Sequence, residues 1–324
     1  MSKQPLNSPG GIWAITSYFN PIGYRARRAN YEVFQQHLNV PLLTVEQGQD
    51  GNYELNPEDA DVLVQVPAHD VMWQKERLLN LALKALPAEC QKVAWLDCDI
   101  IFERDDWADL AVATLEHSKL VQLFGKVCFL PREVDLSHSI ADQYFLRCPS
   151  AASGSVDGTL GRNELVPTVE GLEGVGMASD VANGFAWVMR RELLEQFGFY
   201  DASIIGGGGD YKFSQAALGQ YKTTGEFHLM NASQFEHYLE WATPLYQAVQ
   251  GKIGIAPGNI YHLWHGEFLG RQYKPRHLLL NQHDFDPYQD IAIDEHGCWR
   301  WNSNKPALHQ AIRDYFKGRR EDGH

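Results

Sequence analysis

Residues 93–102, with the sequence VAWLDCDIIF, constrain the fold more than any other stretch of the chain. Apolar residues on both sides of two carboxylates predict a buried strand whose carboxyl end holds the only charges of the run. In an extended segment, side chains two residues apart share a face at roughly 6–7 Å, so Asp97 and Asp99 would act on one ligand. Two ionised carboxylates in so apolar a setting are costly unless a cation lies between them or one is protonated. The segment therefore indicates a divalent-metal site, and spacing alone leaves an exposed corner with two solvated carboxylates as the alternative.

Length and composition exclude several classes of protein. The 324 residues suffice for one large α/β domain or two smaller ones. Hydrophobic residues make up 44% of the chain and charged residues 21%, as is usual for a globular protein. The formal net charge of −13 argues against a nucleic-acid partner. The five cysteines are odd in number and form no CxxC pair, which suits a reducing compartment and excludes the usual zinc-binding spacings.

The same sequence gives expectations about location and layout. Residues 1–9 have no apolar signal core, and no stretch approaches ~18 apolar residues, so we expect a cytoplasmic protein without a transmembrane segment. We expect a short lead over residues 1–10, one main domain over 11–282, and a C-terminal tail with a helix over 283–324. The sequence does not indicate the oligomeric state.

Apolar periodicity predicts strands alternating with helices. Such alternation is typical of an α/β fold with a largely parallel sheet and right-handed crossovers. The expected strands, besides the segment at 93–102, cover residues 11–16, 40–45, 61–66, 120–124 and 183–189. The expected helices cover residues 24–38, 73–86, 105–115, 190–197 and 305–316.

Polar residues close to the first strand are candidate ligand contacts. That strand ends in a turn with Tyr18 and Asn20, where open α/β sheets usually bind ligands. Arg25, Arg27 and Arg28 follow in the first turns of a helix. Basic residues there oppose the helix dipole, so an anionic group nearby would stabilise them. A solvated helix face is the alternative for each arginine.

Two glycine-rich stretches follow in the second half of the chain. Residues 148–183 form a long loop that we interpret as a mobile lid. Residues 206–209 are four glycines, which allow the backbone to pass close to a ligand, and Asp210 follows where a helix would begin. Asp210 is therefore either an ordinary N-cap or a catalytic base.

A third group lies further downstream. His262 and His265 lie on either side of Trp264. Three further candidates follow within the next few residues: Arg271, Tyr273 and Arg276. A lone histidine is usually a core or surface residue, but two histidines with an aromatic and arginines favour a site. The basic residues at 317–320 are expected to lie on a solvated tail.

These segments together resemble the GT-A glycosyltransferases, and most closely the catalytic domain of the β-1,4-galactosyltransferase family. The resemblance runs from about residue 16 to residue 276. Its motifs occur in the family's order: the helix starting at Trp73 and containing Lys75, Asp97-Cys98-Asp99, the segment from Asn183-Gly184-Phe185 to Gly207-Gly208-Gly209-Asp210, and His265. The fold that the resemblance implies is the GT-A fold, a Rossmann-like mixed sheet flanked by helices.

The resemblance also implies roles for residues. Asp99 and His265 would hold Mn²⁺, with His262 as second choice, and Asp97 would contact the ribose or a metal-bound water. Asp210 would be the base of an inverting transfer from a UDP-sugar to a hydroxyl acceptor such as a glycan or a lipid-linked precursor. The donor contacts would come from the strand end, the basic helix and the motifs: Tyr18, Asn20, Arg28, Lys75, Gly184, Trp264 and Arg271.

The chain departs from the family at three of these positions. Gly209 stands where the family has Glu, Gly206 where it has Trp, and Lys75 where it has Arg. These departures concern the acceptor and the donor sugar more than the chemistry. A retaining transferase and a non-catalytic sugar-nucleotide- or glycan-binding relic stay open as alternatives. A phosphatase with an Asp nucleophile is disfavoured, because Ile101 stands where those enzymes carry Thr or Val.

Overall fold

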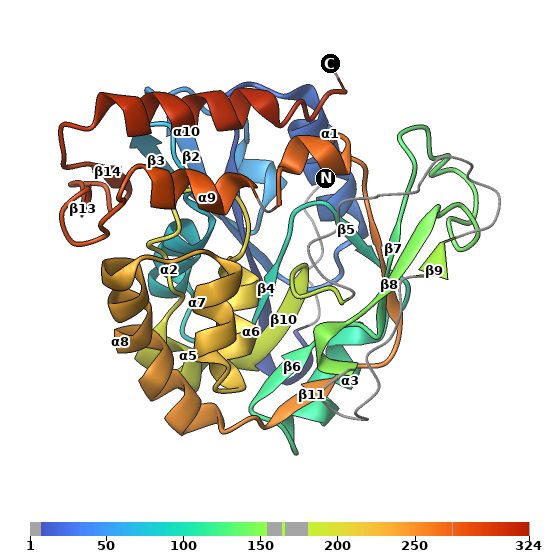
Figure 1. Cartoon of the computed structure of the whole chain (residues 1–324). Helices are drawn as coiled ribbons and strands as arrows, with labels where there is room; N and C mark the ends of the chain where they lie inside the picture. The colour runs from blue at the N-terminus through green and yellow to red at the C-terminus, as the bar shows by residue number, and fades with distance from the viewer. Residues whose placement is uncertain (1–7, 154–163, 166–180, 274, 324) are drawn as a thin grey trace.

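The core of the protein is a seven-stranded mixed sheet (Figure 1). The structure is a computed structural model, and it describes residues 8–153, 164–165, 181–273 and 275–323. The strand order is β11-β6-β10-β4-β1-β2-β3, and only β10 of these seven runs antiparallel to its neighbours. The strands are β1 (Ile12–Phe19), β2 (Leu42–Gln49), β3 (Val62–Ala68), β4 (Lys92–Leu96), β6 (Leu120–Gln122), β10 (Ala186–Arg190) and β11 (Ile253–Ile255). The predicted α/β class, with a mixed sheet flanked by helices, is confirmed.

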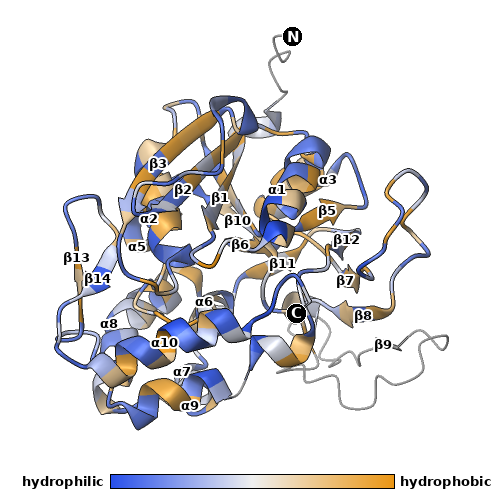
Figure 2. Ribbon diagram, turned by 90° about the horizontal axis from the view of Figure 1, so that it is seen from above, coloured by the Kyte–Doolittle hydropathy of each residue, from blue (hydrophilic) through white to orange (hydrophobic). Residues whose placement is uncertain are grey.

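Helices cover both faces of this sheet. Successive residues of β4 face opposite sides: Val93 and Trp95 belong to one apolar cluster, whereas Ala94 and Leu96 belong to another. Burial on both faces explains why the strands read as nearly continuous apolar runs, which are largely orange in Figure 2. The helices are α1 (Arg25–His37), α2 (Lys75–Ala85), α3 (Trp107–Leu115), α5 (Arg191–Phe197), α6 (Gly209–Ala217), α7 (Tyr221–Phe227), α8 (Ala232–Val249), α9 (Pro275–Gln282) and α10 (Pro306–Gly318), with short 3-10 turns η1 (Pro9–Gly11), η2 (Pro57–Asp59) and η3 (Phe268–Arg271). In the described part of the chain, no helix combines the length and the apolar composition needed to cross a bilayer.

A second, five-stranded sheet lies beside the first. Its order is β5-β12-β7-β8-β9, and a separate hairpin is formed by β13 (Ile291–Ile293) and β14 (Trp299–Trp301). The five strands are β5 (Ile100–Phe102), β7 (Lys126–Phe129), β8 (Leu146–Pro149), β9 (Glu164–Leu165) and β12 (Asn259–His262). β5 and β12 are antiparallel, with Ile100 opposite His262. This register brings His262, from the second half of the chain, next to the segment that contains Asp97 and Asp99.

The expectation of one continuous strand over residues 93–102 is wrong. β4 ends at Leu96 in the first sheet, and β5 begins at Ile100 in the second. Residues 97–99 form the turn between them, so Asp97 and Asp99 are not two residues on one face of a strand. The chain changes direction here because the first half of this segment pairs in the first sheet and the second half pairs in the second sheet.

The other expectations differ from the structure mainly at element ends. The helix at Asp210 begins one residue earlier, at Gly209, and its N-cap is Gly208. Asp210 is therefore in the first turn and is not the N-cap. The proposed lid falls mostly on residues 154–163 and 166–180, which lie outside the described residues.

The C-terminal segment packs against the start of α1, as Figure 1 shows near the label C. The hydroxyl of Tyr24 donates to the carbonyls of Phe316 and Lys317, both at 2.9 Å. The carboxylate of Asp322 accepts a hydrogen bond from the backbone N–H of Ala26 at 2.8 Å. The anionic group expected at this basic helix start is thus supplied by the chain itself, and residues 317–320 are not simply a solvated tail.

The packing of β4 gives a test of the core. Trp95 is 2% exposed, and its ring lies 5.2 Å from Phe199 and 5.0 Å from Phe213, centroid to centroid. We expect Trp95→Ala to lower the free energy of unfolding by about 3–5 kcal/mol, because it leaves a large cavity. Leu269→Ala, at a side chain that is 80% exposed, should change it by less than about 0.5 kcal/mol. Chemical denaturation measures both values, and equal losses would contradict this description of the core.

Candidate active site

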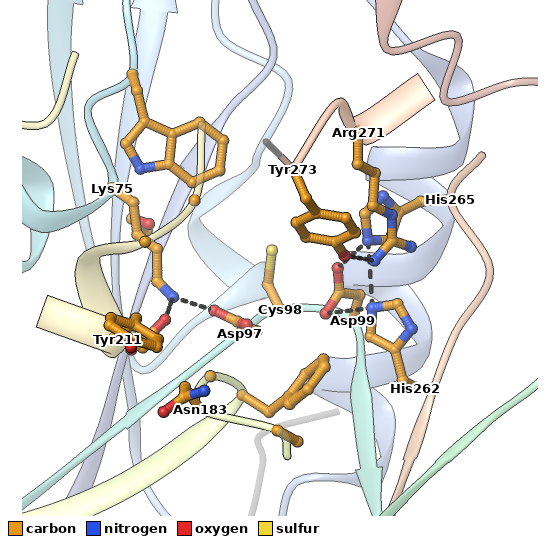
Figure 3. A pocket seen from close by; sticks show the side chains of 18 of the residues that line it. Lys75, Asp97, Cys98, Asp99, Asn183, Tyr211, His262, His265, Arg271 and Tyr273 are labelled. Carbon is orange, nitrogen blue, oxygen red and sulfur yellow. Dashed lines mark hydrogen bonds and ion pairs between the residues drawn. The ribbon is translucent and has the colours of Figure 1, made fainter. Parts of the chain in front are cut away.

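A pocket opens where β1 and β4 end. The strand ends contribute Thr16, Ser17 and Leu96, and the turn at residues 97–99 follows directly. The four glycines at residues 206–209, here called the glycine loop, contribute Gly207 and Gly208. Figure 3 shows two polar groups in this pocket, one around Lys75 and one around His265, with Cys98 between them. The carboxyl ends of strands in an open α/β sheet are the usual place for a ligand site.

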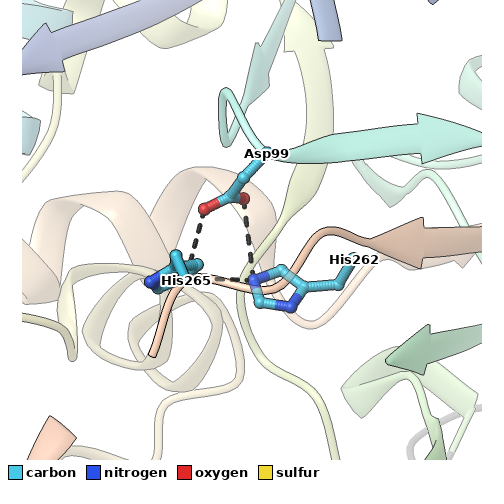
Figure 4. A group of neighbouring side chains, drawn as sticks. All are labelled: Asp99, His262 and His265. Carbon is cyan, nitrogen blue, oxygen red and sulfur yellow. Dashed lines mark hydrogen bonds and ion pairs between the residues drawn. The ribbon is translucent and has the colours of Figure 1, made fainter. Parts of the chain in front are cut away.

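The first polar group is a triad of Asp99, His262 and His265 (Figure 4). The Nε2 atoms of the two histidines are 3.2 Å apart. Oδ2 of Asp99 is 3.2 Å from Nε2 of His265, and its Oδ1 is 3.7 Å from Nε2 of His262. The pairing of β5 with β12 creates this arrangement, and the N–H of Leu263 fixes it by donating to the carbonyl of Asp99 at 2.8 Å.

The electrostatics of the triad suit a cation. Burial, followed by the charge of Arg271, lowers the pKa of His262 and of His265 well below the ordinary range, so both rings are neutral and each has a nitrogen lone pair. Burial, helped by the charge of Asp97, raises the pKa of Asp99 to about 7. Oδ1 of Asp99 is buried without a hydrogen-bond partner. One carboxylate and two imidazoles form a donor set that fits a divalent transition metal such as Mn²⁺.

The second polar group consists of Lys75, Asp97 and Asp210. Nζ of Lys75 lies 2.5 Å from Oδ1 of Asp97 and 2.6 Å from Oδ2 of Asp210. Burial disfavours the ammonium, but Asp210 and Asp97 together raise the pKa of Lys75 well above its ordinary value. Burial raises the pKa of Asp210, and the charge of Lys75 opposes that rise. A carboxylate held in this way is suited to accept a proton.

Two glycine positions make room for these carboxylates. A Cβ atom added to Gly184 would lie 3.4 Å from Oδ2 of Asp210. A Cβ atom added to Gly209 would lie 1.7 Å from Oε1 of Glu76, so a side chain there is excluded. Glu76 is 4% exposed and lines the pocket, and burial raises its pKa to about 7.

The remaining charges of the pocket are arginines. Arg271 and Arg276 come from η3 and α9, and both are more than nine-tenths buried. Arg27 of α1 and Arg319 of the C-terminal segment share the buried carboxylate of Glu321, at 2.6 Å and 2.5 Å. The pocket is therefore completed by residues that lie almost at the end of the chain.

The predicted site residues are only partly brought together. Asp97, Asp99, Lys75, Gly184, Asp210, His262, His265 and Arg271 all line the pocket. Four others do not. The hydroxyl of Tyr18 donates to Glu54, because Tyr18 packs under α1 against Tyr31. Asn20 closes a local turn with Tyr24.

The other two exceptions are on α1 and after β12. Arg28 pairs with Asp59 at 3.0 Å, so its neighbour Arg27 reaches the pocket instead. Trp264 stacks under Arg132, 4.9 Å from the guanidinium carbon to the ring centroid, outside the lining. These residues have structural partners in place of the ligand contacts expected of them.

Sequence reasoning also missed residues of the pocket. Glu76 sits next to the selected Lys75 and could have been noticed, because a charged residue there interrupts the apolar face of α2. Arg319 carries no local signal, because its contribution depends on where the C-terminal segment folds back and on its pairing with Glu321 behind the pocket lining. Arg27 could not be chosen over Arg28 without the position of that segment.

Comparisons with known proteins identify no family. No protein-family model matches the chain, and no curated protein matches it. Among solved structures, glucosyl-3-phosphoglycerate synthase from Mycobacterium tuberculosis, crystallised with Mn²⁺, UDP-glucose and phosphoglyceric acid, is 12% identical over 90% of this chain and 85% of that one, with a TM-score of 0.39. A mutant of Drosophila β1,4-galactosyltransferase 7 with manganese, UDP-Gal and xylobiose is 12% identical over 66% and 62%, with a TM-score of 0.29. S. aureus TarS is 12% identical over 97% and 44%, with a TM-score of 0.34. At these values the similarity identifies neither a family nor an activity.

The triad predicts binding of a divalent metal. We expect Mn²⁺ to stabilise the wild-type protein, by about 2.7 kcal/mol at a hundred times its dissociation constant, because the ion would bind only the folded state. Asp99→Ala and His265→Ala should each abolish most of this effect. Melting temperatures with and without Mn²⁺ measure it. His138→Ala, at a side chain that is 78% exposed, is the matched control and should respond as the wild type does. Equal stabilisation of Asp99→Ala and wild type would rule out the triad as the site.

Proposed function

We propose that this protein is a metal-dependent glycosyltransferase of the GT-A type, which moves a sugar from a nucleotide-sugar, a UDP-sugar in this proposal, to a hydroxyl acceptor. The observation that carries the proposal is the convergence of Asp99 with His262 and His265, from segments more than 150 residues apart, in the same pocket as Asp210. A solvated corner with two aspartates would not bring two neutral imidazoles to one carboxylate. A single pocket with a cation site and a separate buried carboxylate suits group transfer.

The resemblance of the sequence to the β-1,4-galactosyltransferase family supports the same reading. Its motifs were identified separately along the chain. Residues from each of them line one pocket, namely Lys75, the turn at residues 97–99, Gly184, the end of the glycine loop with Asp210, and His265. Four motifs with unrelated functions would not be expected to line the same pocket.

Asp99, His262 and His265 would hold the Mn²⁺ ion, and Arg271 beside them would face the phosphates of the donor. When bound, the metal would act as a Lewis acid that neutralises the charge on the leaving diphosphate. Arg271 has a buried Nε without a hydrogen-bond partner and donates from Nη1 to the hydroxyl of Tyr273 at 3.2 Å. A guanidinium with donors to spare suits an oxyanion of the nucleotide.

Asp210 is proposed as the base that takes the proton of the acceptor hydroxyl, which then attacks the anomeric carbon from the face opposite the leaving group. The transfer would therefore invert the configuration of the sugar. The ammonium of Lys75 favours the ionised form of Asp210 and so opposes the effect of burial on its pKa, and Asp97 holds Lys75 on its other side. Asp97 thus acts on the base through Lys75, in addition to any contact with the ribose.

The role of Asp210 predicts a selective loss of turnover. Asp210→Asn should lower kcat by roughly 10²–10⁴-fold, because a positioned base supplies about that factor. Its affinity for UDP with Mn²⁺ should stay close to that of the wild type. Release of UDP from a panel of UDP-sugars, with and without hydroxyl acceptors, measures kcat, and calorimetry measures UDP binding. Asp106→Asn, at an exposed ion pair with Arg104, is the control. If the turnover of Asp210→Asn equals that of the wild type, Asp210 is not the base.

The burial of Asp210 predicts the pH dependence of the reaction. The base must be ionised, so kcat should rise with pH through the pKa of Asp210, which burial raises above its ordinary value. Lys75 favours the ionised form, and Lys75→Met should therefore move the acidic limb of the kcat profile to still higher pH. Lys222→Met, at a side chain that is 88% exposed, should leave the limb in place. A limb that stays put or moves to lower pH in Lys75→Met would contradict the pairing of Lys75 with the base.

A further inference from the structure

Arg276 is a buried cation of the pocket without an acidic partner. Its side chain is 5% exposed and lines the pocket from α9. Its Nη1 donates to the carbonyl of Arg271 at 3.4 Å, and its Nε approaches Nε2 of His277 at 3.5 Å, both long contacts. Over the described ranges of the chain, Arg276 forms no ion pair with a carboxylate. A buried charge that is not neutralised is costly unless a ligand pairs with it.

The other arginines of the pocket lie beside an internal carboxylate or beside the triad. Arg27 and Arg319 share the carboxylate of Glu321. Arg271 lies close enough to the triad for its charge to lower the pKa of both His262 and His265. Arg276 is therefore the arginine of this pocket that neither an internal carboxylate nor the metal site explains.

Tyr273 contacts the side chains of both Arg271 and Arg276. Its hydroxyl accepts a hydrogen bond from Arg271, whereas the guanidinium carbon of Arg276 lies 4.8 Å from the centroid of its ring. Figure 3 shows Tyr273 and Arg271 together on the side of the metal triad. Arg276 lies instead against the glycine loop: a Cβ atom added to Gly207 would be 2.5 Å from its Nη2. That loop leads directly into α6, whose first turn carries Asp210.

We propose that the acceptor carries an oxyanion, a phosphate or a carboxylate, and that Arg276 binds it. The inference rests on the proposed function, because it assigns the acceptor end of the same pocket. The planar guanidinium fork matches the two oxygens of an oxyanion. The lack of a side chain at Gly207 makes room for the guanidinium of Arg276, and both residues line the pocket. A neutral sugar acceptor would leave this buried charge without an anionic partner, because the other side-chain hydrogen bond of Arg276 goes to the hydroxyl of Tyr315.

The test measures oxyanion binding to the full-length protein saturated with Mn²⁺ and UDP, which fill the donor side. Sulfate serves as a phosphate mimic that does not precipitate Mn²⁺, acetate serves as the carboxylate probe, and sodium chloride of equal ionic strength sets the baseline. Calorimetry should show saturable binding of sulfate or acetate, and the tighter of the two indicates which oxyanion the acceptor carries. Arg276→Gln should weaken this binding about tenfold or more. Arg276→Lys should fall between Arg276→Gln and wild type, because it keeps the charge but loses the fork. Arg300→Gln, at an exposed arginine of β14, should match the wild type.

Three results would overturn the inference: no saturable binding of either probe to the wild type, equal binding to Arg276→Gln, or displacement of UDP by the probe, which would assign Arg276 to the donor. UDP affinity of each variant is measured in the same experiment and verifies that its pocket is folded. A wild type that binds no UDP would contradict the proposed function instead. In that case the titration is carried out without nucleotide, and its dependence on Arg276 still decides whether this residue binds an oxyanion.

Discussion

The antiparallel pairing of β5 with β12 is the constraint on which the site depends. Because Ile100 lies opposite His262, the carboxylate of Asp99 faces two imidazoles that are more than 150 residues distant in sequence. β4, on the other side of the turn, belongs to the first sheet, so Asp97 stays beside Lys75 at the start of α2. A turn of three residues between two sheets therefore divides two neighbouring carboxylates between two tasks. One faces the two imidazoles, and the other faces the ammonium of Lys75, which also pairs with Asp210.

Local patterns in the sequence predicted the α/β class, every strand of the first sheet except β11, and the residues whose chemistry is concentrated in short motifs, but not the second sheet or the helices α7, α8 and α9. The apolar residues around Asp97 and Asp99 correctly indicated burial, whereas the close approach of the glycine loop to a ligand stays a prediction. The same patterns could not show that the strand breaks at residues 97–99. The alternation of side chains along a strand indicates which face of the sheet each side chain lies on. It does not indicate with which sheet the following residues pair. The histidine pair was found by its spacing, but its meeting with Asp99 is a consequence of long-range register.

For the arginines of α1, the outcome depends on partners from distant segments of the chain. Arg27 and Arg28 are adjacent in α1, and only the location of Glu321 and Asp59 decides which of them faces the pocket. Glu321 is 1% exposed and neutralises Arg319 as well as Arg27. Removing one partner from a buried pair of this kind typically costs about 3–5 kcal/mol, since it leaves the other charge unpaired. The C-terminal segment is therefore held in place by the same contacts that close the pocket.

The glycine loop explains how distant segments come to define this pocket. At Gly209 the space that a side chain would occupy is taken by Glu76 of α2, and at Gly207 it is taken by Arg276 of α9. At Gly208 a Cβ atom would lie 2.5 Å from Nε2 of His228, which directly follows α7. Gly207 and Gly208 also have φ angles of 74° and 93°, which other residues rarely adopt. The loop thus provides backbone and room, while its neighbours provide the charges. A molecule that binds next to Asp210 would therefore contact side chains of α2 and α9, and from the loop it would contact mainly backbone.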